Sequence, residues 1–351
     1  MKIAYDAKRY FHNQSGLGNY SRDVVRIVGE NSEHETLLLD SKSSEEGFGR
    51  SGIYKVLPSF FWRSFGIWKN VKRLKANVFH GLSNELPFGK APKGVKVVVT
   101  IHDVIFKHYP AHYKALDRYI YDCKTKKACK KADEIIAISP QTKSDLISFY
   151  KVPEEKIKVI YQPISKDFGL KPIQEELELC KQKYNLPEAF YLYVSSFEER
   201  KNQAYLIEVF KELKEGYLVL AGFKGKAFSK VKSLITKYDM GDKVFLLSDA
   251  SKADLRALYA LCKVFLSPSV LEGFGIPILE ALHSGKTVYC NGQENFKEMF
   301  GKACAYFDVS DPESLVKLIE SKVSIPAVDR EEVLKSFEEK KLAEEILIVY
   351  G

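Results

Sequence analysis

Two glutamates, Glu272 and Glu280, bracket a short glycine-containing segment whose chemistry suits a sugar or phosphate ligand. Glycines on both sides of Phe274 let the backbone turn tightly and approach a ligand closely. Pro277 fits the first turn of a helix, where free N–H groups suit anionic or hydroxyl-rich ligands. Each carboxylate can accept hydrogen bonds from two neighbouring sugar hydroxyls. The alternative is an ordinary glycine turn with two surface glutamates.

A second motif, Arg200-Lys201-Asn202, follows an apolar run at 191–194 that is typical of a strand. The lysine could hold a diphosphate as a point charge and the arginine as a planar fork. By itself, this motif could equally be a charged and solvated helix start.

Two further motifs lie in the first half of the chain. His102, in Thr100-Ile101-His102-Asp103, ends an apolar run, a position that is equally consistent with a functional and with a structural histidine. Gly16 and Gly18 open a helix and offer backbone N–H groups there. They do not complete the GxGxxG pattern, and no acidic residue at the right distance completes a nicotinamide fingerprint.

The elements that must position these motifs alternate between apolar strands and helices, which predicts an α/β protein with parallel sheets covered on both faces. We expect strands at 3–5, 36–39, 53–57, 77–80, 97–101, 134–138 and 156–160, and at 191–194, 217–221, 244–247, 264–266, 287–290 and 305–307. Helices are expected at 18–28, 113–131, 204–213 and 253–262, and after the capping pair Ser139-Pro140. In such folds ligands bind beyond the carboxyl ends of strands, where all of these motifs lie.

The length of 351 residues suits two domains. The proline-bearing stretch 163–172 marks the change, so we expect domains at 1–165 and 166–330. Residues 331–351 are expected to form a polar helix that packs back toward the first domain. The tripeptide Asp167-Phe168-Gly169 matches a kinase metal motif in letters only, because no glycine-rich strand or catalytic loop accompanies it.

Taken together, the four motifs resemble the GT-B retaining glycosyltransferases of family 4, also called group 1, over nearly the whole chain. The segment from Glu272 to Glu280 resembles their E-x7-E signature, and Arg200-Lys201-Asn202 resembles their R-K-N segment. The segment 16–20 resembles their N-terminal loop, and 100–103 resembles a T-x-H-D segment of mannosyltransferase-like members. The resemblance implies two Rossmann-like domains that face a central cleft. One departure is Ser195-Ser196, where many members carry Gly-Arg.

The resemblance also implies roles for these residues. Glu280 would bind the nucleotide ribose, and Glu272 with the backbone of residues 273–276 (Gly273, Phe274, Gly275 and Ile276) would hold the donor sugar. Lys201, helped by Arg200, would stabilise the leaving diphosphate. His102 would lie beside the donor sugar, and Gly16 and Gly18 would complete the donor-binding set. The catalytic residues would thus be His102, Lys201, Arg200 and Glu272.

The reaction implied is transfer of a mannosyl or glucosyl unit from a GDP- or UDP-linked sugar to a glycan or lipid-linked acceptor, as in polysaccharide or lipopolysaccharide biosynthesis. No metal and no cofactor are expected, because the chain has no Asp-x-Asp motif and the basic side chains can take the leaving charge. The resemblance implies retention at the anomeric carbon. We favour attack from the front face, assisted by the leaving phosphate.

Composition and charge indicate the cellular compartment and the kind of ligand that the protein would bind. Six cysteines without a CxxC pair predict reduced core thiols and a cytoplasmic protein, and neither a signal peptide nor a membrane-spanning run is expected. The formal charge of +8 favours anionic ligands. Segment 60–75 has no acid, and Phe61, Phe65 and Trp68 share one helical face. It could dock on an anionic membrane or pack in the first domain. The lysines of 124–131 are expected to form a solvated face.

Two other classes compete with a transferase. A nicotinamide-dependent sugar epimerase or dehydrogenase is disfavoured by the incomplete glycine fingerprint and the absence of a suitable Tyr-x-x-x-Lys pair. A degenerate homologue that binds nucleotide sugar without transferring it is disfavoured by the intact motif residues. No nucleic-acid partner is expected.

Overall fold

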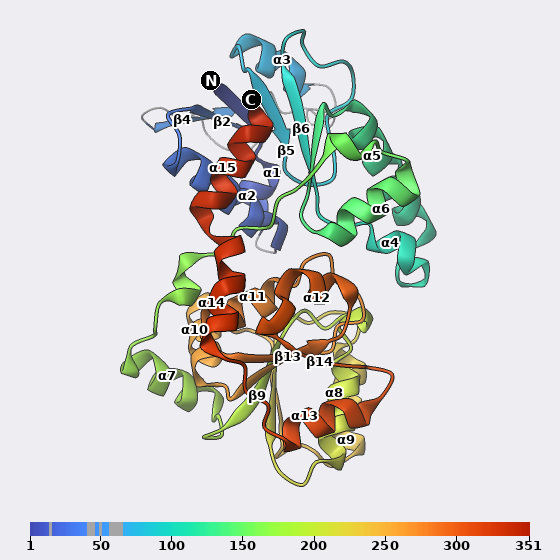
Figure 1. The fold of residues 1–351 in the computed structure, drawn as a ribbon, viewed down its shortest axis with the longest axis vertical. Coiled ribbons are helices and arrows are strands. Elements are labelled where there is room, and N and C mark those ends of the chain that lie inside the picture. Colours follow the sequence, from blue (N-terminus) through green and yellow to red (C-terminus); the bar gives the residue numbers. More distant parts are fainter. Residues whose placement is uncertain (14–15, 41–45, 49–50, 56–65) are drawn as a thin grey trace. The chain divides into compact units, whose positions relative to one another are not determined.

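The computed structural model describes residues 1–13, 16–40, 46–48, 51–55 and 66–351. The chain forms two compact units (Figure 1). Unit 1 comprises Met1–Pro163 and Phe337–Gly351, and unit 2 comprises Ile164–Ser336. The first division therefore falls inside the proline-bearing stretch from which the sequence predicts the change of domain.

Unit 1 is built on a sheet of eight strands. These are β1 (Lys2–Asp6), β2 (Glu35–Asp40), β3 (Glu46–Phe48), β4 (Ser51–Lys55), β5 (Val78–Gly81), β6 (Lys96–Ile101), β7 (Glu134–Ala137) and β8 (Ile157–Val159). Their order is β3-β4-β2-β1-β5-β6-β7-β8, and only the β3–β4 pair is antiparallel. The strand order reverses direction between β1 and β5. Strand β3 was not predicted from the sequence, because its three residues are too short to carry a periodic pattern.

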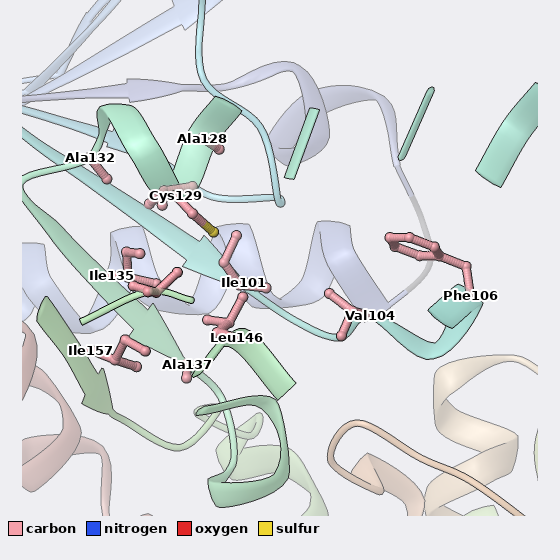
Figure 2. Close-up of a cluster of buried hydrophobic side chains, with 12 residues drawn as sticks. Ile101, Val104, Phe106, Ala128, Cys129, Ala132, Ile135, Ala137, Leu146 and Ile157 are labelled. Atoms are coloured by element: carbon pink, nitrogen blue, oxygen red, sulfur yellow. The ribbon is translucent and has the colours of Figure 1, made fainter. Parts of the chain in front are cut away.

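Helices cover both faces of this sheet. They are α1 (Lys8–His12), α2 (Gly16–Glu30), α3 (Ile67–Arg73), α4 (Ile105–His108), α5 (Ala115–Lys131), α6 (Pro140–Tyr150) and α15 (Glu339–Tyr350). Ser139 caps α6 as predicted, accepting a hydrogen bond from the Thr142 N–H at 3.1 Å. Figure 2 shows how Ile101 of β6, Ala137 of β7, Cys129 of α5 and Leu146 of α6 share one buried cluster. That cluster fixes α5 and α6 on the sheet.

Unit 2 has the more regular sheet, with six strands that are all parallel. They are β9 (Phe190–Val194), β10 (Tyr217–Ala221), β11 (Val244–Leu247), β12 (Val264–Ser267), β13 (Thr287–Asn291) and β14 (Ala305–Phe307). The helices are α7 (Gln174–Tyr184), α8 (Gln203–Glu212), α9 (Phe228–Lys237), α10 (Lys252–Leu261), α11 (Ile276–His283), α12 (Glu294–Phe300), α13 (Pro312–Glu320) and α14 (Ala327–Leu334). The order β11-β10-β9-β12-β13-β14 is doubly wound and reverses between β9 and β12.

The C-terminal segment differs from the single polar helix that the sequence predicts. It forms two helices, α14 in unit 2 and α15 in unit 1, separated by a 3-10 turn at Lys335–Phe337. Helix α15 lies beside α2 (Figure 1) and buries an apolar face that includes Leu342 and Ile346. Arg26 of α2 pairs with Glu339 at 2.5 Å. The apolar stripe of α15 is weak in the sequence because the charged residues of α14 come just before it. When both helices are treated as one, the charged residues spread over every side of the expected helix.

No helix in the described part of the chain is both long enough and apolar enough to cross a membrane. All six cysteines are free, and all except Cys123 are buried, which agrees with the predicted core thiols.

Candidate donor site

The strand order of unit 2 brings two separate motifs together. Arg200 and Lys201 follow β9, and Glu272 follows β12, so both motifs leave the carboxyl ends of the two strands between which the order reverses. An Arg200 guanidinium nitrogen, Nη1, lies 3.0 Å from Glu272 Oε2, and Lys201 Nζ binds Glu272 Oε1. The backbone N–H of Val270 also donates to the Arg200 carbonyl at 2.8 Å. This junction is the ligand-binding position of doubly wound sheets.

The electrostatics of this group favour an anionic ligand. Burial alone would raise the pKa of Glu272, but the neighbouring charges of Lys201 and Arg200 overcome it and lower the pKa to about 2. Glu272 is therefore ionised at neutral pH. Lys201 and Arg200 bring two positive charges to this group, on side chains that are only 11% and 23% exposed. A diphosphate brought beside them would meet a preorganised positive site.

Glu272 is held by residues that the sequence motifs did not single out. Ser269 Oγ donates to Glu272 Oε1 at 2.8 Å, and the Tyr193 hydroxyl lies 2.8 Å from Ser269 Oγ. The same Tyr193 hydroxyl donates to the Lys201 carbonyl at 2.9 Å. Tyr193, a residue of β9, therefore links the two motifs through its hydroxyl group. The Ser-x-x-Glu spacing of Ser269 and Glu272 was a local signal that could have identified the serine, whereas Tyr193 looks like any buried strand residue.

The glycine segment forms the sharp start of α11. Gly275 is left-handed, with φ 92°, and is the residue before the first turn of the helix. A Cβ there would lie 2.9 Å from the Phe296 ring, so both the backbone conformation and the space require glycine. Asn295 Nδ2 donates to the carbonyls of Glu272 and Gly273 at 3.2 and 3.3 Å, which fixes the turn from outside. Pro277 lies in the first turn of α11, as predicted.

Glu280 lies within α11 and has a different environment from Glu272. Burial raises its pKa to about 7, although a hydrogen bond from Tyr259 acts in the opposite direction. The Tyr259 hydroxyl donates to Glu280 Oε2 at 2.6 Å. The two glutamates of the motif thus differ. Glu272 is an ionised carboxylate between two cations, whereas the pKa of Glu280 lies close to neutral pH. Tyr259 lies in α10, and no sequence spacing connects it to the motif.

The departure at Ser195-Ser196 is part of a tightly packed loop. Gln203 Nε2 donates to Ser195 Oγ and to the Ser196 carbonyl, both at 2.9 Å. Gly222 approaches this loop so closely that a Cβ there would lie 1.9 Å from the Ser195 carbonyl oxygen. The serines therefore bind neighbouring protein groups, and Ser195 is buried.

His102 lies in unit 1 after β6, as predicted, and it is buried. Its Nε2 is 2.9 Å from the Leu82 carbonyl, which makes Nε2 the protonated nitrogen and Nδ1 the acceptor. Burial lowers the pKa of His102 to about 4, so the ring is neutral at physiological pH. The Tyr20 ring packs edge-on against it, with centroids 4.6 Å apart.

The two glycines at the start of α2 differ in what constrains them. A Cβ on Gly18 would lie 1.8 Å from the Asn13 carbonyl oxygen, whereas a Cβ on Gly16 would have nothing within 4 Å. The Gly18 N–H donates to Asn13 Oδ1 at 3.2 Å. Close packing against Asn13 therefore explains why residue 18 is glycine. At Gly16 the space around the backbone would accept a side chain.

Segment 60–75 is described only from residue 66 onward, so Phe61 and Phe65 lie outside the described residues. Trp68 is buried in α3, 4.9 Å from the Phe79 ring, and its Nε1 donates to the Phe88 carbonyl at 2.8 Å. Of the two alternatives for this segment, Trp68 therefore supports the helix packed in the first domain, because its ring belongs to the core.

Two protein-family models match separate parts of this chain. The model of the group 1 glycosyl transferases matches residues 176–341, and that of glycosyltransferase family 4 matches residues 35–168. An Escherichia coli O-antigen chain mannosyltransferase B is 26% identical over 344 residues, which is 90% of this chain and 88% of that protein.

Solved structures show the same fold. Sucrose-phosphate synthase of Thermosynechococcus elongatus matches 100% of this chain and 98% of its own, with a TM-score of 0.77 and 16% identity. Anabaena Alr3699/HepE, solved in complex with UDP and glucose, matches 99% and 98%, with a TM-score of 0.74 and 16% identity. The fold is thus GT-B, and this chain belongs to the group 1 and family 4 glycosyltransferases.

Proposed function

We propose that this transferase moves a mannosyl unit from a GDP- or UDP-linked sugar to a glycan or lipid-linked acceptor, with retention at the anomeric carbon and without a metal. The observation that carries the proposal is the position of Glu272 between Arg200 and Lys201, at the start of the helix that carries Glu280. One short region thus offers cations for a diphosphate and two carboxylates for hydroxyl groups.

Mannose is preferred over glucose because of the relatives. One relative that matches this chain over most of both lengths is named an O-antigen chain mannosyltransferase. A nucleotide donor is supported by the structural neighbour that was solved with UDP and glucose. Glucose therefore stays as the second donor sugar to be tested.

In the proposed reaction, Lys201 and Arg200 stabilise the negative charge that grows on the leaving diphosphate. The positive end of the α11 helix dipole adds to this stabilisation, although Pro277 has no N–H and the Ile278 N–H donates to the Gly275 carbonyl at 2.9 Å. Glu280 accepts hydrogen bonds from the ribose hydroxyls, and Glu272 accepts them from the donor sugar. The acceptor hydroxyl attacks the anomeric carbon on the face that the diphosphate leaves, and its proton passes to the departing phosphate oxygen.

His102 is proposed to contact the donor sugar through its neutral ring. Nδ1 is the acceptor of that ring, so the contact would be a hydrogen bond from a sugar hydroxyl. The role needs no proton transfer, which agrees with a pKa of about 4.

A thermal-shift screen against UDP, GDP, UDP-glucose and GDP-mannose tests the donor site, because a bound ligand raises the melting temperature by mass action. We expect either UDP or GDP to raise the melting temperature clearly. In a separate product assay, the sugar conjugate of that nucleotide should be consumed by transfer or hydrolysis. The anomeric configuration of the product, read by NMR, tests retention, and activity in EDTA tests metal independence. Absence of a shift with every nucleotide would contradict the proposal, and a glycosyl adduct trapped on Glu272 would contradict front-face attack.

A further inference from the structure

A cavity of about 750 Å³ in unit 1 has a lining that the proposed donor chemistry does not use. We call it the lysine pocket after the residues Lys8, Lys90, Lys124, Lys127, Lys130 and Lys131, which line it together with the loop 85–89. Only two carboxylates, Asp6 and Glu85, are among its lining residues, so the lining has a formal excess of four positive charges. The volume lies in the range of small-molecule sites.

Helix α5 supplies most of this charge through its periodicity. Thr125, Ala128 and Cys129 are buried against the sheet. Residues three, four and seven positions apart share a helix side, so Lys124, Lys127 and Lys131 form a row along one edge of that buried face. Lys126 points elsewhere and does not line the pocket. The predicted solvated face is confirmed for the exposed lysines Lys124, Lys126, Lys127 and Lys130, whereas Lys131 is half-buried.

The inner wall of the pocket is fixed by contacts. Lys131 Nζ donates to the carbonyls of Pro87, at 2.6 Å, and Gly89, and it lies 4.3 Å from the centre of the Trp68 ring. Burial lowers the pKa of this lysine to about 8, so a bound anion would favour its charged form. Lys124 pairs with Glu85 at 2.8 Å. These contacts hold two ammonium groups in place before any ligand arrives.

Three of the other lysines, Lys90, Lys127 and Lys130, lie at the exposed side of the pocket. Lys127 lies 4.9 Å from the centre of the Phe88 ring, a contact that leaves its N–H donors available. In the described part of the chain no carboxylate pairs with Lys90, Lys127 or Lys130, and all three are exposed. Lysine ammonium groups with unused donors around a concave surface are suited to phosphate oxygens.

The place in the fold also suits a ligand. Asp6 is the last residue of β1, and the strand order of unit 1 reverses between β1 and β5. In doubly wound sheets the crevice at such a reversal is where ligands bind. The pocket thus extends from this reversal point to the row of lysines on α5.

We propose that the lysine pocket binds a phosphate or diphosphate group of the acceptor, so that the acceptor is an anionic glycan phosphate or a diphosphate-linked lipid and not a neutral sugar. This inference rests on the proposed function, because it names the second substrate of the same transferase. A neutral glycan would offer no anionic group to the exposed ammonium groups of Lys90, Lys127 and Lys130.

Calorimetric titration of inorganic pyrophosphate into the full-length chain tests the pocket. Saturating UDP or GDP, whichever the thermal-shift screen selects, keeps the phosphate-binding groups of unit 2 occupied. We expect the double variant Lys127→Gln/Lys130→Gln to bind pyrophosphate roughly tenfold more weakly, since each exposed contact contributes modestly. The matched control Lys114→Gln/Lys126→Gln removes the same charge from exposed positions outside the pocket and should bind like the wild type. Equal weakening in both double variants, or in neither, would overturn the proposal.

A second arm distinguishes the source of the phosphate. Neutral phosphatidylcholine vesicles with and without a polyprenyl diphosphate are sedimented with wild type and with both double variants. Binding that needs the diphosphate lipid together with Lys127 and Lys130 supports a lipid-linked acceptor, and binding of free pyrophosphate alone supports a soluble glycan phosphate. If neither probe depends on these lysines while the nucleotide shift is intact, this inference fails and the proposed function stands. Loss of the nucleotide shift in the wild type would instead refute the proposed function.

Discussion

The Tyr259 hydroxyl donates a 2.6 Å hydrogen bond to Glu280 Oε2, which ties two consecutive helices of unit 2 through one carboxyl group. The bond occupies one oxygen and orients the other. It also favours the ionised form, but burial is the larger effect and the pKa of Glu280 is raised to about 7. The group that we assign to the ribose therefore titrates in the physiological range.

Nucleotide affinity should consequently depend on pH. Below pH 7 Glu280 is protonated and accepts hydrogen bonds less well, so affinity should fall as the pH drops from 8 to 6. Glu280→Gln should bind more weakly at pH 8 and lose this slope. Calorimetry on both proteins with the same nucleotide checks this, since titration of the ligand's own phosphate is common to both. Parallel pH slopes in the two proteins would contradict the assignment.

The same shift predicts a change in stability. A carboxyl group whose pKa is raised on folding stabilises the fold below its unfolded pKa, and this contribution is lost as the pH rises through the folded pKa of about 7. Glu280→Gln should therefore gain stability relative to wild type between pH 5 and pH 8, on the order of 1 kcal/mol after solvent screening. Melting temperatures of the ligand-free proteins at both pH values measure this gain.

Glu272→Gln should separate binding from transfer. Lys201 and Arg200 would keep their charges without the carboxylate, so UDP or GDP should bind at least as tightly as to wild type. Transfer should fall about 100-fold or more because the contact to the donor sugar is lost. Glu199→Gln, which breaks only an exposed pair with Lys230, is the control and should leave both properties unchanged. A Glu272→Gln rate within a few-fold of wild type would remove Glu272 from the site.

Gly275→Ala should be strongly disruptive. The residue has φ 92°, and the added methyl would lie 2.9 Å from the Phe296 ring. We expect a loss of about 2 kcal/mol or more in stability and weaker nucleotide binding. Gly285→Ala shares the positive φ, at 75°, but has nothing within 4 Å of the new methyl, so it measures the backbone term alone. Equal losses in urea denaturation of the two variants would show that the Phe296 contact is unimportant.

His102→Ala should reduce transfer by about 100-fold while the nucleotide thermal shift stays close to that of wild type. At saturating donor, the wild-type rate should show no inflection from His102 between pH 6 and 8, because its pKa of about 4 keeps it neutral there. A full rate in the variant would make His102 a structural residue of the Tyr20 contact only.

Tyr350→Phe tests the attachment of α15. The Tyr350 hydroxyl lies 2.7 Å from His80 Nδ1, and His80 Nε2 lies 2.8 Å from Thr100 Oγ1. Removing the hydroxyl leaves a buried imidazole nitrogen without its partner, which should cost about 1–3 kcal/mol. Tyr217→Phe, at a side chain that is 44% exposed, should change the unfolding free energy little. Equal effects of the two variants would contradict a structural role for the His80 contact.

Much of this arrangement could be predicted from the sequence because its signals are local. Short β-branched runs such as that ending at Ile101 identify strands, and Ser139-Pro140 identifies a capped helix start. Alternation of these elements then predicts parallel sheets. Three of the four motifs come after a strand, β6, β9 or β12, whereas α1 separates the motif of Gly16 and Gly18 from β1. The family resemblance and the GT-B fold are confirmed.

What could not be predicted depends on contacts between distant residues. Tyr193 and Tyr259 support the two glutamates from neighbouring elements, and neither position has a local pattern that separates it from an ordinary core tyrosine. Most lysines of α5 are exposed, as the sequence predicts, but the pocket that several of them line forms only because the loop 85–90 packs nearby. The burial of Trp68 likewise depends on its contact with Phe79, which is fixed by the sheet order and not by helical spacing.

Helix α15 completes unit 1 although 164–336, the whole of unit 2, precedes it in the chain. During synthesis the ribosome therefore makes unit 2 before it makes the last part of unit 1. Until α15 is made, His80 and the surface that α15 covers stay exposed in residues 1–163. Unit 2 is continuous in sequence, so it can fold as soon as residue 336 has left the ribosome. The order of translation thus favours completion of unit 2 first and makes the earliest residues among the last to reach their final packing.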